Sequence, residues 1–122
     1  MSTPTRHFKR GAVVMANLEP ITGSEQGGTR PVLIVSSLEK IRASRSRPMY
    51  VIVPFTRSQT LTGPLAPRIT ARTGGVPLDS TALVMHVRSI DPARIRSQAG
   101  TLNVDELEHV LNGVRVMLDM EG

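Results

Sequence analysis

The sequence predicts a small, mainly β domain, a barrel or a sandwich, that ends in one amphipathic helix. Two patterns support this. Short apolar runs punctuated by Gly and Pro fill the first three quarters of the 122 residues, which is typical of small barrels and sandwiches. Beyond Asn103 the apolar residues recur at helical spacing. A chain of this length forms one domain, so residues 1–122 are assigned to a single unit.

Three longer strands are expected, at Gly11–Leu18, Pro31–Ser37 and Met49–Phe55. The second contains four consecutive apolar residues, from Val32 to Val35, which predicts a strand buried on both faces. Proline lacks the N–H that a central strand needs, so Pro54 is expected to mark the end of its strand or an exposed edge.

Shorter elements follow from the same punctuation. Strands are predicted at Arg68–Ala71, once or twice within Thr81–Ile90, and at Ile95–Thr101. The connecting segments are Glu19–Arg30, the polar and basic Leu38–Pro48, Gln59–Pro67 and the turn Thr73–Pro77. Residues 1–10 are polar and basic, and they are expected to form a flexible tail.

The C-terminal helix has a start signal and an apolar stripe. Asn103 is followed three residues later by Glu106, a pattern that resembles a capping box. The stripe consists of Val104, Leu107, Val110, Leu111, Val114, Met117 and Leu118. It predicts about four helical turns that pack either on the barrel or across a subunit interface.

The charge favours an anionic partner. The net charge is +5, and 13 of the 15 basic residues are arginine, whose planar fork suits phosphate better than lysine does. Nucleic acid is therefore a reasonable partner, although the charge could also serve solubility or bind an acidic protein. The chain has no cysteine, which excludes disulfides, thiolate nucleophiles and Cys-ligated zinc. No apolar run is long enough to span a membrane and no signal segment is recognisable, so a cytoplasmic protein is expected.

Two segments could supply the catalytic groups of a metal-free ribonuclease. Such an enzyme needs a base, an acid and a cation that faces the phosphorane. A Gly-rich loop leads into Arg30, which Pro31 biases toward an extended conformation, and Glu25 could reach the same pocket. Thr56 and Arg57 follow the third strand. Each segment also has a plainer interpretation. The first could be an ordinary hairpin loop with Arg30 exposed, and Thr56 could be a strand-end threonine whose hydroxyl satisfies a backbone group.

An ordered set of motifs resembles the MazF/PemK toxins over nearly the whole chain. The set comprises Arg10–Val14, Leu18–Pro20, Gly23–Gly27, Thr29–Ser36, Val53–Thr56, Gly75–Ser80, Arg88–Asp91, Gly100–Leu102 and the closing helix. The resemblance implies a small SH3-like barrel of the CcdB/MazF type, usually a homodimer. It also implies sequence-specific, metal-independent cleavage of single-stranded RNA and neutralisation by an acidic antitoxin that folds on binding.

The resemblance also implies roles for individual residues. Arg30 and Thr56 match the catalytic pair, and Glu25 matches a glutamate linked to activity, for which the resemblance implies the role of a base. RNA-binding roles are expected for Ser24, Gln26, Thr29, Arg57, Ser58 and Arg88. No cofactor is implied, and the isolated histidines at His7 and His109 predict no metal site.

One departure from the family leaves alternatives open. Many members carry Asp-Gln before the Arg-Ser/Thr motif, whereas this chain has Met85-His86. Because imidazole titrates near neutrality, His86 is a candidate for catalysis or for RNA contact; a structural strand histidine is the plainer interpretation. Two other functions remain: a toxin of the same fold that poisons DNA gyrase, and a barrel that binds RNA or protein without catalysis.

Overall fold

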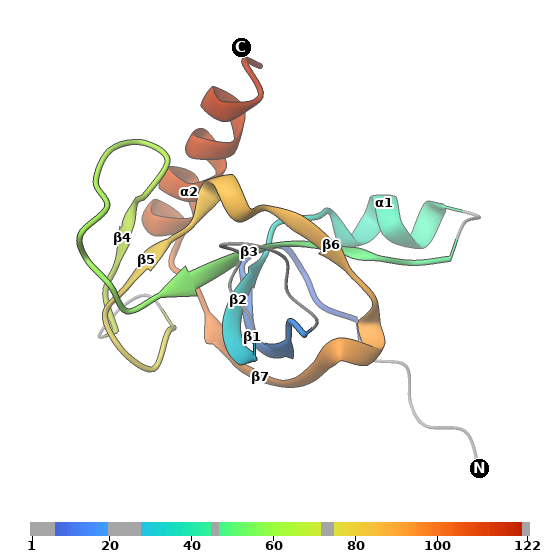
Figure 1. Ribbon diagram of the computed structural model, residues 1–122. Helices are drawn as coiled ribbons and strands as arrows, with labels where there is room; N and C mark the ends of the chain where they lie inside the picture. Colours follow the sequence, from blue (N-terminus) through green and yellow to red (C-terminus); the bar gives the residue numbers. More distant parts are fainter. Residues whose placement is uncertain (1–6, 20–27, 45–46, 72–74, 121–122) are drawn as a thin grey trace.

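The computed structural model describes residues 7–19, 28–44, 47–71 and 75–120. Seven antiparallel strands form one curled sheet, and helix α2 stands beside the end formed by β4 and β5 (Figure 1). The strands are β1 (Ala12–Asn17), β2 (Thr29–Ile34), β3 (Tyr50–Thr56), β4 (Arg68–Ile69), β5 (Ser80–Ala82), β6 (Arg88–Ile90) and β7 (Ile95–Thr101). The helices are α1 (Leu38–Ala43) and α2 (Val104–Met117), with single 3-10 turns η1 (Val84–His86) and η2 (Pro92–Arg94). The predicted mainly β fold with a C-terminal helix is confirmed.

The sheet divides at β3. Its strand order is β4-β5-β3-β2-β1-β7, and β6 pairs separately with β3. The first part of β3, Tyr50–Ile52, pairs with β6, whereas Phe55 and Thr56 pair with β5. The chain between β5 and β6 is the turn η1, so the stretch from Ser80 to Ile90 supplies two strands separated by a bend.

Each face of the central strands carries its own apolar cluster. Val32 and Ile34 of β2 point to one face, and Leu33 and Val35 to the other, which confirms the prediction of a strand buried on both faces. The barrel-side cluster contains Phe8, Ala12, Val14, Ala16, Leu18, Val32, Ile34, Tyr50, Ile52, Ile90 and Ile95. The helix-side cluster contains Val13, Leu33, Val35, Val53, Phe55, Ile69, Val76, Ala82, Val84, Leu102 and Val110. Helix α2 covers the second cluster.

The expectation for Pro54 was wrong. Pro54 is buried, lies inside β3 and pairs with Val32 of β2. Its carbonyl accepts a hydrogen bond from the Leu83 N–H (2.9 Å), on the side where β3 changes its neighbour from β6 to β5. A proline is tolerated there because no paired residue requires the N–H that the ring lacks.

The segment Leu38–Pro48 is not only a connection, because α1 occupies its first half. The Ser37 side chain caps this helix by accepting a hydrogen bond from the Lys40 N–H (3.3 Å). None of its residues is buried, and only Ile41 packs partly against the barrel-side cluster. One helical turn and a half is too short to produce an apolar stripe, so the sequence pattern missed it. Figure 1 shows α1 well apart from α2.

The start of the described chain is more ordered than the predicted tail. Phe8 is buried and meets Tyr50 edge-on, with ring centroids 5.8 Å apart. The Phe8 N–H donates to the Tyr50 hydroxyl (3.1 Å). Arg10 Nε donates to the Val35 carbonyl (2.8 Å). The chain therefore joins the barrel from Phe8 onward, while residues 1–6 lie outside the described residues.

Helix α2 begins as the capping pattern predicts. The Asn103 Oδ1 accepts from the Glu106 N–H (2.8 Å), and the Asn103 Nδ2 donates to the Glu106 carboxylate (2.9 Å). Val110 and Gly113 are buried against the sheet and the neighbouring loop. Four further members of the stripe pack on the helix-side cluster: Leu107, Leu111, Val114 and Met117. Of the two packing modes left open, the structure shows α2 on the barrel.

Replacing Asn103 with alanine should lower the free energy of unfolding by about 1 kcal/mol, because the cap hydrogen bond to the first turn is lost. Urea denaturation followed by circular dichroism measures the change. Asn112→Ala is the matched control, since Asn112 is exposed in the helix interior and alanine favours helix there. An equal loss in both variants would contradict the capping role.

Candidate active site

Thr56 is the last residue of β3, and its hydroxyl is held by the chain that follows. The Ser58 N–H donates to Thr56 Oγ1 (3.2 Å). The Ser58 hydroxyl in turn lies 3.1 Å from the Thr60 hydroxyl. Thr56 is half-buried, whereas Arg57 and Ser58 are exposed. A hydroxyl that accepts one N–H still has a hydrogen to donate, so Thr56 can serve as a donor to an anion.

The pairing of β2 with β3 puts Arg30 and Thr56 on the same face of the sheet. Strands β2 and β3 pair Ile34 with Ile52, Leu33 with Val53 and Val32 with Pro54. Arg30 and Thr56 lie two residues beyond the pair formed by Val32 and Pro54, where β3 pairs with β5 instead. Paired residues of antiparallel strands point to the same face, and side chains two residues apart on a strand share a face. Both side chains are therefore on the face of the barrel-side cluster, to which Val32 belongs. On its other side Arg30 pairs with Ala16 of β1, so a central strand holds the arginine.

A hollow opens beside this pair. Its volume is about 200 Å³, and it is lined by Pro31, Phe55, Thr56, Arg57, Pro77, Leu78 and Ser80. Pro31 and Arg57, the residues that follow Arg30 and Thr56, form part of its wall, whereas Arg30 itself is not among the lining residues. The hollow has room for a small anionic group, and its lining includes the hydroxyl residues Thr56 and Ser80 and the guanidinium of Arg57.

Arg88 lies on the same face but at a distance. It is half-buried and pairs with Ile52, four residues before Thr56 on β3. Four residues of a strand span about 13 Å. Arg88 therefore suits a neighbouring phosphate of an extended polymer better than the phosphate at Thr56.

The row of side chains across Arg30 and Thr56 continues onto two further strands. Thr56 pairs with Thr81 of β5, and Thr81 pairs with Arg68 of β4. Arg68 donates two hydrogen bonds to Gln59, to its side-chain oxygen (2.9 Å) and to its carbonyl (2.7 Å). Sequence reasoning missed Thr81 and Arg68, because short strands carry no signal that fixes which residues stand opposite each other.

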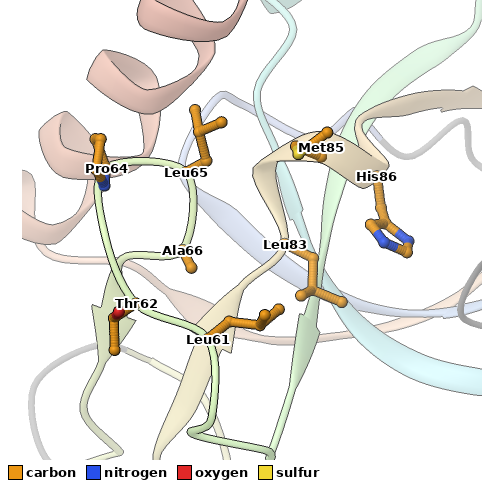
Figure 2. A pocket seen from close by; sticks show the side chains of 8 residues that line it. All are labelled: Leu61, Thr62, Pro64, Leu65, Ala66, Leu83, Met85 and His86. Atoms are coloured by element: carbon orange, nitrogen blue, oxygen red, sulfur yellow. The ribbon is translucent and has the colours of Figure 1, made fainter.

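His86 lies in a different place. It ends η1 and lines an apolar groove of about 390 Å³ with Leu61, Thr62, Pro64, Leu65, Ala66, Leu83 and Met85. Figure 2 shows the segment Leu61–Ala66 on one side of this groove and the turn Leu83–His86 on the other. The groove shares no lining residue with the hollow at Thr56. The His86 Nδ1 is buried and has no hydrogen-bond partner among the described residues.

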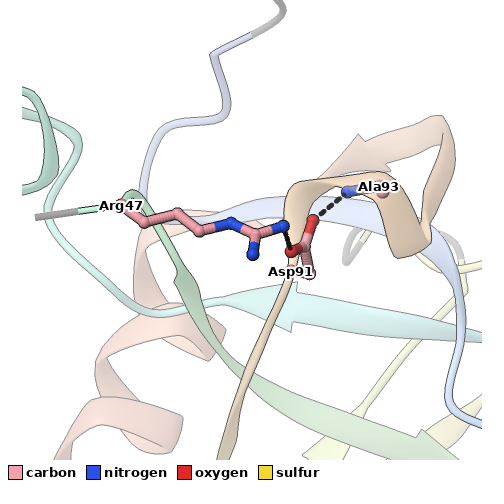
Figure 3. Close-up of polar contacts among 3 residues, drawn as sticks. All are labelled: Arg47, Asp91 and Ala93. Carbon is pink, nitrogen blue, oxygen red and sulfur yellow. Dashed lines mark hydrogen bonds and ion pairs between the residues drawn. The ribbon is translucent and has the colours of Figure 1, made fainter.

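Asp91, the last residue of the motif Arg88–Asp91, has a structural role. Its carboxylate caps η2 by accepting from the Ala93 N–H (2.8 Å), and it forms an ion pair with Arg47 (Figure 3). The Arg47 side chain is 78% exposed, so the pair contributes little stability by itself. This acidic residue therefore joins the segment after α1 to the end of β6 rather than contributing to the hollow.

The remaining predicted residues divide into two groups. Thr29 is exposed, precedes Arg30 in the sequence and pairs with Asn17 at the end of the β1–β2 ladder. Ser24, Glu25 and Gln26 lie outside the described residues. Within the described ranges no three His, Asp or Glu side chains gather closely enough to hold a metal ion.

Comparison with known proteins defines the class first. Residues 9–118 match the family described as PemK-like, MazF-like toxin of type II toxin-antitoxin system, and the chain belongs to this family. The curated protein Endoribonuclease EndoA of Bacillus subtilis is 32% identical over 111 residues, which cover 90% of this chain and 93% of EndoA. The resemblance stated from the motifs is therefore confirmed.

Solved structures agree with the fold. A crystal structure of MazF from Deinococcus radiodurans has a TM-score of 0.79 and 26% identity, and the match covers 95% of this chain and 100% of that one. A MazE-MazF structure from the same organism has a TM-score of 0.71 and 21% identity, with 96% and 100% covered. Both confirm the MazF-type architecture. None of the described helices is long and apolar enough to cross a membrane.

Proposed function

We propose that this MazF-like toxin is an endoribonuclease that cuts single-stranded RNA at specific sequences without a metal ion. The observation that carries the proposal is the pairing of β2 with β3, which puts Arg30 and Thr56 on one face of the sheet. Membership of the toxin family and the similarity to Endoribonuclease EndoA support the same chemistry.

The reaction proposed is attack of an RNA 2′-oxygen on the adjacent phosphorus. The new P–O bond closes a 2′,3′-cyclic phosphate, the bond to the 5′-oxygen breaks, and Arg30, acting as the general acid, donates the proton that restores the 5′-hydroxyl. Arg30 faces the phosphorane and neutralises its added charge, which is the stage at which fixed donors contribute most. Thr56 donates its hydroxyl hydrogen to a phosphate oxygen. Glu25, which precedes β2 in the sequence, takes the 2′ proton as a general base.

The neighbouring polar residues would bind the strand on either side of the cut. Arg57 lines the hollow with Thr56. Arg88 lies on the same face at the distance of a further phosphate. Thr29 and Ser58 flank Arg30 and Thr56 in sequence, and we assign RNA contacts to them and also to Ser24 and Gln26. Such contacts would make RNA binding weaken as salt is raised.

We also propose a homodimer that an acidic antitoxin neutralises in the cytoplasm. The MazE-MazF structure supports the antitoxin, and the net charge of +5 suits an acidic segment. Large apolar side chains are exposed on η1 and at the end of α2: Met85, Val116, Leu118 and Met120. Exposed apolar surface of this kind is typical of subunit contacts. A chain without cysteine fits a reducing compartment.

The test is incubation of the purified protein with a long single-stranded RNA in EDTA, followed by mapping of the new ends. Discrete cuts that carry cyclic phosphates and 5′-hydroxyls are the expected result. RNA that stays intact would contradict the proposal. Cuts that disappear in EDTA and return with Mg²⁺ would contradict its metal-free part.

His86→Gln should leave the cleavage rate largely intact and alter the choice of cut site at most. The groove at His86 shares no lining residue with the hollow at Thr56, so we assign the imidazole an RNA contact rather than proton transfer. Rates on a panel of short RNAs measure both quantities. A loss as large as that of Arg30→Ala would contradict the contact role and assign His86 to catalysis.

A further inference from the structure

The buried hydroxyl of Thr81 is a polar group whose presence the fold does not explain. Thr81 is fully buried, and its Oγ1 has no hydrogen-bond partner among the described residues. Buried polar groups are nearly always hydrogen-bonded, because leaving one unpaired costs stability. A valine has almost the same shape and would avoid that cost. An unpaired hydroxyl at such a position therefore calls for a function.

The position of Thr81 in the sheet indicates which residue its hydroxyl can bind. Thr81 stands directly opposite Thr56 in the β3–β5 pairing, and opposite Arg68 on its other side. The two threonines form a hydrogen-bonded backbone pair, as the bond from the Leu83 N–H to the Pro54 carbonyl two residues away requires. Their Cβ atoms are then about 5 Å apart on the same face. Rotation about χ1 can bring two hydroxyls at this separation into hydrogen-bond contact.

We infer that Thr81 is a positioning residue for Thr56, and that it donates a hydrogen bond to Thr56 Oγ1 when RNA is bound. This inference rests on the proposed nuclease function. In the structure, Thr56 Oγ1 accepts one hydrogen bond, from the Ser58 N–H. A hydroxyl oxygen accepts two. Once Thr81 fills the second lone pair, the Thr56 hydrogen can only be donated, and the open side of Thr56 faces the hollow where the phosphate would lie.

The other neighbours of Thr81 do not compete for its hydroxyl. Arg68 has only donors to offer, and its two Nη atoms are bonded to Gln59. Ser80 and Ala82 point to the opposite face, and the Ser80 hydroxyl is bonded to the Leu78 carbonyl (2.7 Å). Among the residues paired with Thr81, Thr56 is thus the one that presents an acceptor on its face.

The test compares Thr81→Val with Thr81→Ser in cleavage of an RNA that contains a mapped cut site. Thr81→Val should lower kcat about tenfold, the effect of one ordinary hydrogen bond, and leave KM unchanged. Its melting temperature should equal or exceed that of the wild type, because an unpaired buried hydroxyl is replaced by a methyl group. Thr81→Ser should restore most of kcat. Thr101→Val, at an exposed strand threonine that does not line the hollow, changes only the side chain; it is the control and should cut at the wild-type rate.

A double-mutant cycle with Thr56→Val separates a positioning role from an independent one. If Thr81 acts through Thr56, the double variant should be no slower than Thr56→Val alone. Wild-type cleavage by Thr81→Val would overturn the inference, and so would a lower kcat accompanied by a lower melting temperature or a raised KM. These outcomes leave the nuclease proposal standing, whereas a wild-type protein that cuts no RNA removes both.

Discussion

Arg30→Ala is expected to lower the rate of RNA cleavage by about a hundredfold to a thousandfold, the loss seen when one fixed donor to a developing oxyanion is removed. The pairing of β2 with β3 puts the guanidinium on the same face as Thr56, where it would face the crowded phosphorane. Single-turnover cleavage of a short RNA with one mapped site measures the chemical step directly. Because the interaction is strongest in the transition state, kcat should fall much more than RNA affinity does.

The matched control for Arg30 is Arg42→Ala. Arg42 is exposed on α1, far from the hollow, and its removal lowers the net charge by the same amount. It should reduce cleavage only slightly, through weaker long-range attraction that salt screens. Equal losses in the two variants at low salt, which vanish together at high salt, would show that Arg30 contributes charge alone. Melting temperatures of both proteins establish that the half-buried Arg30 is not required for folding.

The central part of the fold could be predicted because its signals are local. Four consecutive apolar residues from Val32 predict a strand that is buried on both faces, and the structure shows them divided between the two clusters. The cap of α2 is equally local, because Asn103 and Glu106 lie within one turn of each other. Arg30 and Thr56 could be placed at strand ends for the same reason.

What could not be predicted depends on pairing between distant segments. Nothing in the local sequence shows that Thr81 faces Thr56, since that follows from the register of a three-residue strand. The burial of Pro54 follows from the change of neighbour along β3, which is a property of the whole sheet. Phe8 looked like part of a tail because its partner, Tyr50, is 42 residues away. The sequence could therefore identify individual candidate residues, but which of them lie together could be seen only in the structure.

Gly75→Ala is the substitution with the largest expected effect on stability. Gly75 has a φ of +74°, which an L side chain rarely adopts, and an added Cβ would lie 2.4 Å from the Thr101 carbonyl oxygen of β7. The obstacle is backbone, so the turn itself would have to move. The positive φ costs about 1–2 kcal/mol, and the forced displacement adds about 1–3 kcal/mol. Guanidinium denaturation should show the sum as a lower free energy of unfolding.

Gly28→Ala isolates the part of this loss that comes from contact. Gly28 has nearly the same φ, +76°, but an added Cβ there would meet nothing within 4 Å. The difference between the two variants therefore measures the close approach of the turn to β7. The same turn leads to Pro77 and Leu78, which line the hollow with Thr56, so Gly75→Ala should also slow cleavage under conditions in which the variant is still folded. Equal destabilisation by both variants would mean that the turn relaxes freely and that β7 does not fix the wall of the hollow.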